Sequence, residues 1–396
     1  MSYYLLPKTP FLIHKYIDYI ETTNQPLPSI SNSLSKYLYE IKQKIEEKGK
    51  DWDLFKKYTN PYEYVHTTIP TKKKCVSKDK HLSRSFFKMV EIVKTFKLIL
   101  DNKPITTFHI AEGPGGFIEA VTNIRKNPKD NYIGITLIGE NNDPNVPGWK
   151  KTDTFLKSNP NVYIEYGNDN TGNILSVENF IGCKEQYASS MDLITGDGGF
   201  DFSTDFNKQE LSIANLLFAQ ICYAVTLQKK NGSFILKIFD SFMQHTVDIL
   251  CILTSFYEKV YITKPNTSRY ANSEKYIVCK NFLYNSCDNF FPFIFRAFEK
   301  MITQINNEDI YVSRFLSIPT YLNFIIKLEE YNAIFGQQQL ENIHYTLSLI
   351  DNKHNQEKID ILIKNNIQKS IVWCTKHNLP YNVFLPTSVF STPSIE

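Results

Sequence analysis

Four polar residues that lie far apart in the chain stand beside apolar stretches, in a pattern that could support chemistry. Asp197 and Lys237 each end an apolar stretch, Glu274 directly precedes another, and Lys88 lies in an amphipathic segment. A lysine in an apolar strand is costly to bury without a partner. Carboxylate partners or a catalytic role would therefore account for Lys237 better than core packing. Each residue alone could be a solvated or salt-bridged surface group, but the four together predict a site.

A glycine-rich segment from Phe108 to Ala120 reads FHIAEGPGGFIEA. It predicts a strand, a tight loop and the start of a helix. Three glycines in the four residues 113–116 permit backbone conformations and a close ligand approach that a Cβ would block. Such a loop after a first parallel strand usually holds a nucleotide-like ligand. The spacing is neither the dinucleotide GxGxxG nor a P-loop, and a plain strand-to-helix turn stays an alternative.

The elements that must position these residues alternate between strand and helix from about residue 105 to 283. Seven strands are predicted, at Thr106–Ala111, Tyr132–Ile138, Val162–Tyr166, Met191–Thr195, Ser233–Ile238, Lys259–Thr263 and Tyr276–Lys280. Helical patterns lie between most of them, which indicates an α/β fold with a mostly parallel sheet covered on both faces. The last two strands lack a helix between them, which predicts an antiparallel final pair. The carboxyl ends of the strands would line one crevice, with Asp197 and Lys237 at two of those ends.

The flanking segments carry helical patterns. We expect a helical N-terminal extension at 1–59, the α/β domain at 60–288 and a helical C-terminal region at 289–396. Within these flanks, apolar stripes predict helices at Arg314–Phe335, Gln338–Ile350 and Lys358–Thr375, and an irregular tail from Leu385.

Composition narrows the class of protein. The net charge is +3, so a nucleic-acid site must be a local patch rather than a global field. The seven cysteines are scattered without a CxxC pair, no HExxH occurs, and no zinc spacing is present. No apolar run approaches the roughly 20 residues of a membrane helix. These features indicate a soluble intracellular protein without a signal peptide.

The dispersed motifs resemble those of the FtsJ-type RNA ribose 2′-O-methyltransferases, whose hallmark is a Lys-Asp-Lys-Glu tetrad. The matching positions here are Lys88, Asp197, Lys237 and Glu274. The segments that resemble the cap-specific branch read NPYE at 60–63, EGPGGF at 112–117, DGGF at 197–200 and TSRYANSE at 267–274. NKQE at 207–210 and YITKP at 261–265 further resemble FtsJ-like proteins of large cytoplasmic DNA viruses. The resemblance covers about 60–283.

The resemblance implies a Rossmann-like S-adenosylmethionine-dependent methyltransferase fold with a seven-stranded sheet. It also implies methyl transfer to a ribose 2′-hydroxyl at the 5′ end of capped mRNA, with no metal. Lys237 would be the base, which requires its neutral form. The Lys88 cation would favour that form, whereas Asp197 and Glu274 would orient the amine and act the other way, so the group titrates as a unit. We expect a cytoplasmic location, or a viral factory or virion.

For the cofactor, the resemblance implies a binding loop and two carboxylates. Glu112 would pair with the ammonium of the methionine moiety, and Asp169 would accept from the adenine amino group, although Asp169 could also be an ordinary Asx-turn residue. Glu140 and Asp143 are candidates for the cofactor ribose, and the sequence does not decide between them. The expected cofactor-binding residues are Glu112, Gly113, Pro114, Gly115, Gly116, Phe117, Asp169 and Asp197.

For the RNA, the basic stretch from Lys72 to Arg84 abuts the Lys88 segment and is the candidate phosphate-binding region. A solvated loop is the alternative. Arg269 lies close in sequence to Glu274 and could hold a phosphate bidentately. The expected RNA-binding residues are Lys72, Lys73, Lys74, Arg84 and Arg269. A capped mRNA 5′ end is the expected partner, and the helical extensions could add a protein partner.

Two other functions stay open. One is the same reaction on an internal ribose of rRNA or tRNA. The other is a non-catalytic RNA-binding subunit that keeps the fold, which the intact set of four dispersed polar residues disfavours.

Overall fold

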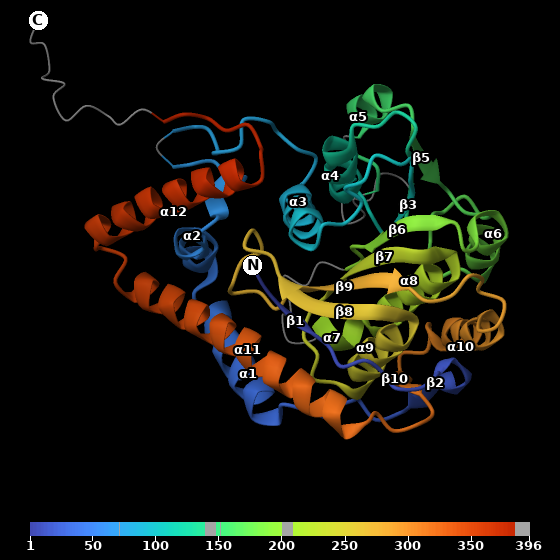
Figure 1. Cartoon of the computed structure of the whole chain (residues 1–396). Coiled ribbons are helices and arrows are strands. Elements are labelled where there is room, and N and C mark those ends of the chain that lie inside the picture. The colour runs from blue at the N-terminus through green and yellow to red at the C-terminus, as the bar shows by residue number, and fades with distance from the viewer. Residues whose placement is uncertain (71, 139–147, 151, 200–208, 385–396) are drawn as a thin grey trace, which may run out of the picture.

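The computed structural model describes residues 1–70, 72–138, 148–150, 152–199 and 209–384 (Figure 1). Its centre is an eight-stranded sheet in the order β1-β8-β9-β7-β6-β3-β4-β5. The strands are β1 (Ser2–Leu5), β3 (Thr106–Ile110), β4 (Asn131–Ile135), β5 (Val162–Glu165), β6 (Met191–Gly196), β7 (Gln228–Ile238), β8 (Tyr257–Lys264) and β9 (Lys275–Phe282). Strands β5, β4, β3, β6 and β7 are parallel, and β9 runs antiparallel to both β7 and β8. The predicted fold class, its seven strands and the antiparallel last pair are confirmed.

Helices cover both faces of this sheet. They are α3 (Ser85–Phe96), α4 (Gly116–Arg125), α5 (Asp153–Ser158), α6 (Val177–Tyr187), α7 (Gln209–Ser212), α8 (Ala214–Leu227), α9 (Gln244–Phe256) and α10 (Phe291–Gln304). Alternate residues of β7 face opposite layers, as the pleat of a strand requires. Phe234 and Leu236 join the core formed with α8 and α9, whereas Ile235 joins the core formed with α3 and α4. Lys237 has the parity of Ile235, so it stands on the α3 face.

The N-terminal flank contains strands that the sequence analysis did not predict. Strand β1 pairs antiparallel with β8 and adds the eighth strand to the sheet. Strand β2 (Ile17–Thr22) pairs with β10 (Tyr311–Leu316) of the C-terminal flank to form a separate two-stranded sheet. The expectation of helical flanks at 1–59 and 289–396 is therefore wrong for these three segments. Their aromatic and β-branched side chains suit a pleated surface, and pairing with distant strands decides the outcome.

The remaining flank elements are helical, as expected. They are η1 (His14–Tyr16), α1 (Asn32–Glu46), α2 (Gly49–Thr59), α11 (Leu322–Asp351) and α12 (Gln356–Lys376). The short 3-10 helix η2 (Glu63–Val65) lies just inside the predicted domain. Arg314 lies in β10 rather than at the start of a helix, because Asp248 of α9 accepts hydrogen bonds from its guanidinium and from the N–H groups of Phe315 and Leu316. The predicted irregular tail from Leu385 lies outside the described residues.

Several buried ion pairs and hydrogen bonds join the flanks to the domain. Lys42 of α1 reaches Asp240, just beyond β7, with 3.0 Å between Nζ and Oδ2. Figure 1 shows α1, α2, α11 and α12 arranged together along one side of the sheet. None of the described helices is long and apolar enough to span a bilayer. The domain boundaries near residues 59 and 288 stay a prediction.

Candidate active site

The four polar residues singled out in the sequence come together as two ion pairs. Lys237 at the carboxyl end of β7 contacts Asp197, which follows β6, with 2.9 Å between Nζ and Oδ1. The same amine also donates to the Asp197 carbonyl at 2.6 Å. Lys88 of α3 contacts both carboxylate oxygens of Glu274, at 2.7 and 2.8 Å. Asp197 and Lys237 therefore lie at neighbouring strand ends, and α3 brings Lys88 over the sheet to meet Glu274.

The two pairs act on each other through charge. Burial lowers the pKa of Lys88, and the charges of Glu274 and Asp197 oppose this effect. Burial alone would raise the pKa of Glu274, but the cations of Lys88, Lys237 and Arg84 bring it below its ordinary value. Glu274 is therefore ionised and Lys88 is its counter-ion. The charge of Asp197 acts on Lys88 and the charge of Lys237 acts on Glu274, so the four residues form one cluster.

The connection between β8 and β9 holds Glu274 in place. Ser268 donates its hydroxyl to Glu274 Oε1 at 2.8 Å. The buried Lys264 amine donates to the Glu274 carbonyl at 2.7 Å and to the side chain and carbonyl of Asn272. These bonds fix the backbone on which Glu274 stands, so its carboxylate has little freedom to leave Lys88.

The glycine loop lies between β3 and α4 and is packed closely. Gly115 has a φ of +107°, a conformation that favours glycine. A Cβ on Gly116 would lie 2.1 Å from Ser85 Oγ, and one on Gly113 would lie 2.4 Å from the Gly148 carbonyl oxygen. A larger residue at 116 would displace the Ser85 side chain, and one at 113 would displace the backbone at Gly148. The glycines therefore allow neighbouring chain segments to pack closely against the loop. The loop itself lies at the carboxyl edge of the sheet, directly after β3.

Glu112 is buried at the start of this loop. Its Oε1 accepts from the N–H groups of Phe117 at 2.6 Å and Ile118 at 3.1 Å, which caps the first turn of α4. Its Oε2 is buried and has no hydrogen-bond partner among the described residues. Burial, with the charge of Asp197, raises the pKa of Glu112 well above its ordinary value. An unpartnered carboxylate oxygen at this place fits a cationic donor such as the ammonium of S-adenosylmethionine.

Asp169 forms the turn after β5. Its Oδ1 accepts from the N–H of Thr171 at 2.9 Å, from the Thr171 hydroxyl at 2.7 Å and from Asn179 Nδ2 at 2.8 Å. This is the Asx-turn geometry that was the alternative to adenine recognition. Asp169 is exposed, and its role toward the cofactor stays a prediction. The two ribose candidates, Glu140 and Asp143, lie outside the described residues, as do Phe200, Asn207 and Lys208 of the quoted motifs.

The basic segment ahead of α3 is fastened by the C-terminal flank. The N–H of Asn382 donates to the Val76 carbonyl at 2.8 Å, and the N–H of Lys78 donates to the Pro380 carbonyl at 3.0 Å. Lys73 and Lys74 are exposed within this segment, and the Lys72 amine lies 6.0 Å from the ring centre of Phe384. The role of the three lysines in binding a phosphate backbone stays a prediction.

The two predicted arginines lie deeper. Arg84 precedes α3, and its Nε is buried without a hydrogen-bond partner among the described residues. Burial and the charge of Arg269 lower the pKa of Arg84. Arg269 instead engages Glu63 with two bonds, from Nε at 2.9 Å and from Nη2 at 2.5 Å. The fork that was expected to hold a phosphate therefore holds a carboxylate, and the phosphate role of Arg269 stays untested.

Sequence reasoning missed three buried residues that hold the site together. Glu63 binds Arg269, and Lys264 binds the backbone carbonyl of Glu274. The third residue is Glu91 of α3, which accepts from the N–H of Asn266. Glu63 and Lys264 stand inside the quoted motifs NPYE and YITKP, and Glu91 stands in the amphipathic segment of Lys88. Charged residues within apolar or motif segments were the available signal. Their partners are distant in sequence, so the contacts themselves could not be predicted.

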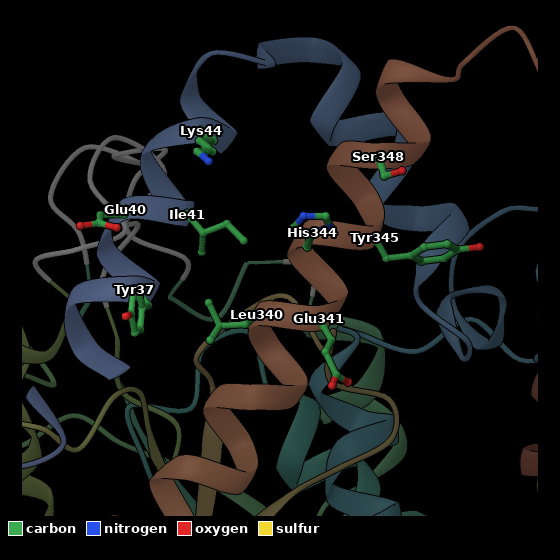
Figure 2. Close-up of a pocket in the computed structure, with 9 residues that line it drawn as sticks. All are labelled: Tyr37, Glu40, Ile41, Lys44, Leu340, Glu341, His344, Tyr345 and Ser348. Carbon is green, nitrogen blue, oxygen red and sulfur yellow. The ribbon is translucent and has the colours of Figure 1, made fainter. Parts of the chain in front are cut away.

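Two grooves lie away from this cluster. One, of about 700 Å³, runs between α1 and α11 in the flanks. Figure 2 shows Tyr37 and Ile41 of α1 facing Leu340 and His344 of α11 across it. The other, of about 500 Å³, lies beside α4 and α5 and is lined mainly by polar residues. Neither contains a residue of the four-residue cluster, so the grooves do not mark the chemistry. A protein partner on the flanks stays a prediction.

Comparison with known proteins decides the family. Residues 81–282 match the profile described as FtsJ-like methyltransferase, which is about half of the chain. The chain belongs to the FtsJ-like methyltransferase family. This membership confirms the predicted family and the predicted methyltransferase class, for which S-adenosylmethionine is the expected methyl donor.

Relatives of this FtsJ-like chain include cellular and viral proteins. Cap-specific mRNA (nucleoside-2′-O-)-methyltransferase 2 of Pongo abelii is 26% identical over 83% of this chain and 43% of its own length. Cap-specific mRNA (nucleoside-2′-O-)-methyltransferase 1 of Trypanosoma brucei brucei is 30% identical over 64% of this chain and 67% of its own length. Probable methyltransferase EP424R of African swine fever virus is 29% identical over 50% of this chain and 49% of its own length. The chain thus spans less than half of the Pongo abelii protein.

Proposed function

We propose that this chain transfers the methyl group of S-adenosylmethionine to the ribose 2′-hydroxyl of a nucleotide at the 5′ end of capped mRNA. The observation that carries the proposal is the meeting of Lys237–Asp197 and Lys88–Glu274 at the carboxyl edge of the sheet, beside the glycine loop. The names of its relatives support the cap as the target. The cytoplasmic or viral-factory location is part of the same proposal, in keeping with the viral relative.

In this proposal Lys237 removes the proton from the ribose hydroxyl. Asp197 takes two of the hydrogen-bond positions of the Lys237 amine, through its carboxylate and its carbonyl. Among the described residues the third position has no hydrogen-bond partner, and in this proposal it faces the substrate hydroxyl. The ion pair with Glu274 keeps Lys88 in place within the cluster. Alignment of the hydroxyl with the methyl group supplies a further part of the acceleration.

The methyl donor carries a sulfonium-activated methyl group, and the chain supplies its binding groups. The backbone of Gly113–Gly116 and the free Oε2 of Glu112 are the candidate contacts. Burial raises the pKa of Glu112 well above its ordinary value, and an ammonium beside its Oε2 would oppose that effect by favouring the ionised carboxylate.

This coupling gives a testable pH dependence for cofactor binding. We expect binding of S-adenosylmethionine to release protons at pH values below the raised pKa of Glu112 and to strengthen as the pH rises toward it. Calorimetric titration in two buffers with different ionisation enthalpies measures the proton release. Glu112→Gln should abolish that release. Binding of the cofactor to the wild-type protein without proton release would rule out the pairing.

The basic segment should contribute to RNA affinity through phosphate contacts. We expect Lys74→Gln to weaken binding of a single-stranded RNA and to lower the slope of log K against log salt by about 0.7. Cofactor affinity should not change. The matched control is Lys300→Gln on α10, whose amine is also exposed and lies 3.7 Å from Asp18. If both variants lose RNA affinity equally, the RNA does not bind at the basic segment.

The target is tested with labelled S-adenosylmethionine and three RNAs. These are a capped RNA, the same RNA uncapped, and a structured fragment of rRNA. We expect labelling of the capped RNA alone. Equal labelling of the capped and uncapped RNAs would refute the cap assignment, and labelling of the rRNA fragment alone would support the internal-ribose alternative. Cofactor binding without labelling of any RNA would support the non-catalytic subunit.

A further inference from the structure

The connection that carries Glu274 is attached to α3 at two points. The first is the ion pair between Lys88 and Glu274. The second is Glu91, which stands almost one turn further along α3. Its Oε1 accepts from the N–H of Asn266 at 3.0 Å, and its Oε2 accepts from the N–H and the hydroxyl of Thr267, both at 3.3 Å. The two attachments are three residues apart on the helix, so together they fix both the position and the direction of the connection.

The C-terminal flank takes part in the second attachment. Trp373 of α12 donates its Nε1–H to Glu91 Oε2 at 3.3 Å. Its indole is buried, with ring centres 5.9 Å from Phe87 and 4.5 Å from His377. Figure 1 shows α12 at the end of the described chain, on the side of the sheet where α2 and α3 lie. A residue of the flank therefore touches the same carboxylate as the connection to Glu274.

The polar surroundings of the Glu91 carboxyl group consist mainly of hydrogen-bond donors. Burial raises the pKa of Glu91, and the N–H groups of Asn266 and Thr267 oppose this, with the amino group of Met1 and the indole of Trp373. No lysine or arginine forms an ion pair with it among the described residues. A buried acceptor of this kind is costly when a donor is lost. Glu91 is thus suited to hold distant segments in one arrangement.

We infer that Glu91 and Trp373 are positioning residues of the methyltransferase site, which fix the connection carrying Glu274 on α3 and so set its contact with Lys88. The path is short, because Thr267 is followed by Ser268, whose hydroxyl binds Glu274 Oε1. The inference rests on the proposed function for its kinetic consequences. It makes the C-terminal flank part of the framework of the active site.

Glu91→Gln is the first test. Glutamine replaces one acceptor oxygen with an NH₂ group, which only donates, so the N–H of either Asn266 or Thr267 loses its acceptor. We expect kcat for methyl transfer to fall about tenfold or more, with unchanged dissociation constants for S-adenosylmethionine and RNA. Trp373→Phe should lower kcat less, in the same direction. The double variant should be no slower than Glu91→Gln alone, because both residues act through one contact.

The matched control is Asp248→Asn. Asp248 is another buried carboxylate that accepts backbone N–H groups and ties a flank strand to the core, but it touches no residue of the tetrad. We expect this variant to lower the thermal midpoint without changing kcat. If Asp248→Asn lowers kcat as much as Glu91→Gln does, the effect is general destabilisation and the inference fails.

A second readout does not depend on activity. Lys88 acetylation by an amine-reactive acetylating reagent is measured by peptide mass spectrometry, with exposed Lys229 as the internal reference. We expect Glu91→Gln to raise Lys88 acetylation several-fold and Asp248→Asn to leave it unchanged. Unchanged acetylation in folded Glu91→Gln would overturn the inference. A wild-type protein that methylates no RNA would refute the proposed function, while the acetylation result would still decide the inference.

Discussion

Lys237→Met is expected to lower kcat for methyl transfer by about 10³-fold, because it removes the group that takes the proton from the ribose hydroxyl. Methionine keeps the length and the apolar stem of the side chain. The Asp197 side chain is 19% exposed at this site, so water can reach the carboxylate after the loss of its partner. Steady-state assays at saturating S-adenosylmethionine and RNA measure the change, and binding of the cofactor should stay within a few-fold of wild type.

The matched control for this prediction lies on the same strand. Lys229 of β7 also pairs with an aspartate, Asp192, at 2.9 Å, but its side chain is 55% exposed and it stands at the opposite end of the strand. Lys229→Met should leave kcat unchanged. If Lys237→Met keeps wild-type kcat, Lys237 is not the base; if both variants lose activity equally, the effect belongs to the strand and not to the site.

Glu274→Gln is expected to cost about 3–5 kcal/mol of unfolding free energy at pH 7, because it leaves the buried Lys88 cation without a counter-ion. Both side chains are nearly inaccessible to water, at 7% and 11% exposure, so solvent offers little compensation. Urea unfolding followed by tryptophan fluorescence measures the loss. Glu258→Gln is the control, since Glu258 is half-exposed and lies 3.9 Å from Lys259, and its loss should cost little.

The same variant has a defined pH dependence. The pKa of Glu274 in the folded protein lies below that of an ordinary glutamate, which is about 4.3 in the unfolded chain. The stabilisation that the Glu274 carboxylate gives to the fold is therefore fully present above about pH 4.3. It is lost as the pH falls toward the pKa of Glu274 in the folded protein. The difference in unfolding free energy between wild type and Glu274→Gln should be constant from about pH 5.5 to 7 and should shrink below about pH 4. A difference that grows on acidification would contradict the ion pair.

The central sheet could be predicted because each strand is an apolar run bounded by turn residues and separated by helical patterns. The side on which Lys237 stands also follows from the alternation of its strand. The flank strands β1, β2 and β10 could not be predicted, because they are short and are stabilised by partners far away in the chain. Local pattern carries no information on such pairings.

The candidate site shows the same limit. Lys88, Asp197, Lys237 and Glu274 could be singled out from their types and places beside apolar stretches. The partners of Arg269 and Trp373 could not, because Glu63 lies 206 residues from the former and Glu91 lies 282 residues from the latter. Charged residues at such separations are paired by the fold as a whole. Arg269 was expected to bind a phosphate because it lies near Glu274 in sequence. In the fold its guanidinium instead binds Glu63.

The most direct test of the central claim removes the acceptor atom. Capped RNAs with a 2′-deoxyribose at the first transcribed nucleotide, at the second, or at both are incubated with wild-type protein and methyl-labelled S-adenosylmethionine, and the digested nucleosides are measured by mass spectrometry. Methyl transfer to a terminal ribose predicts that labelling disappears when the accepting 2′-hydroxyl is absent and that the label in the unmodified RNA lies on that ribose. Labelling that persists with both positions deoxygenated, or a methyl group found on a base, would contradict the proposed function.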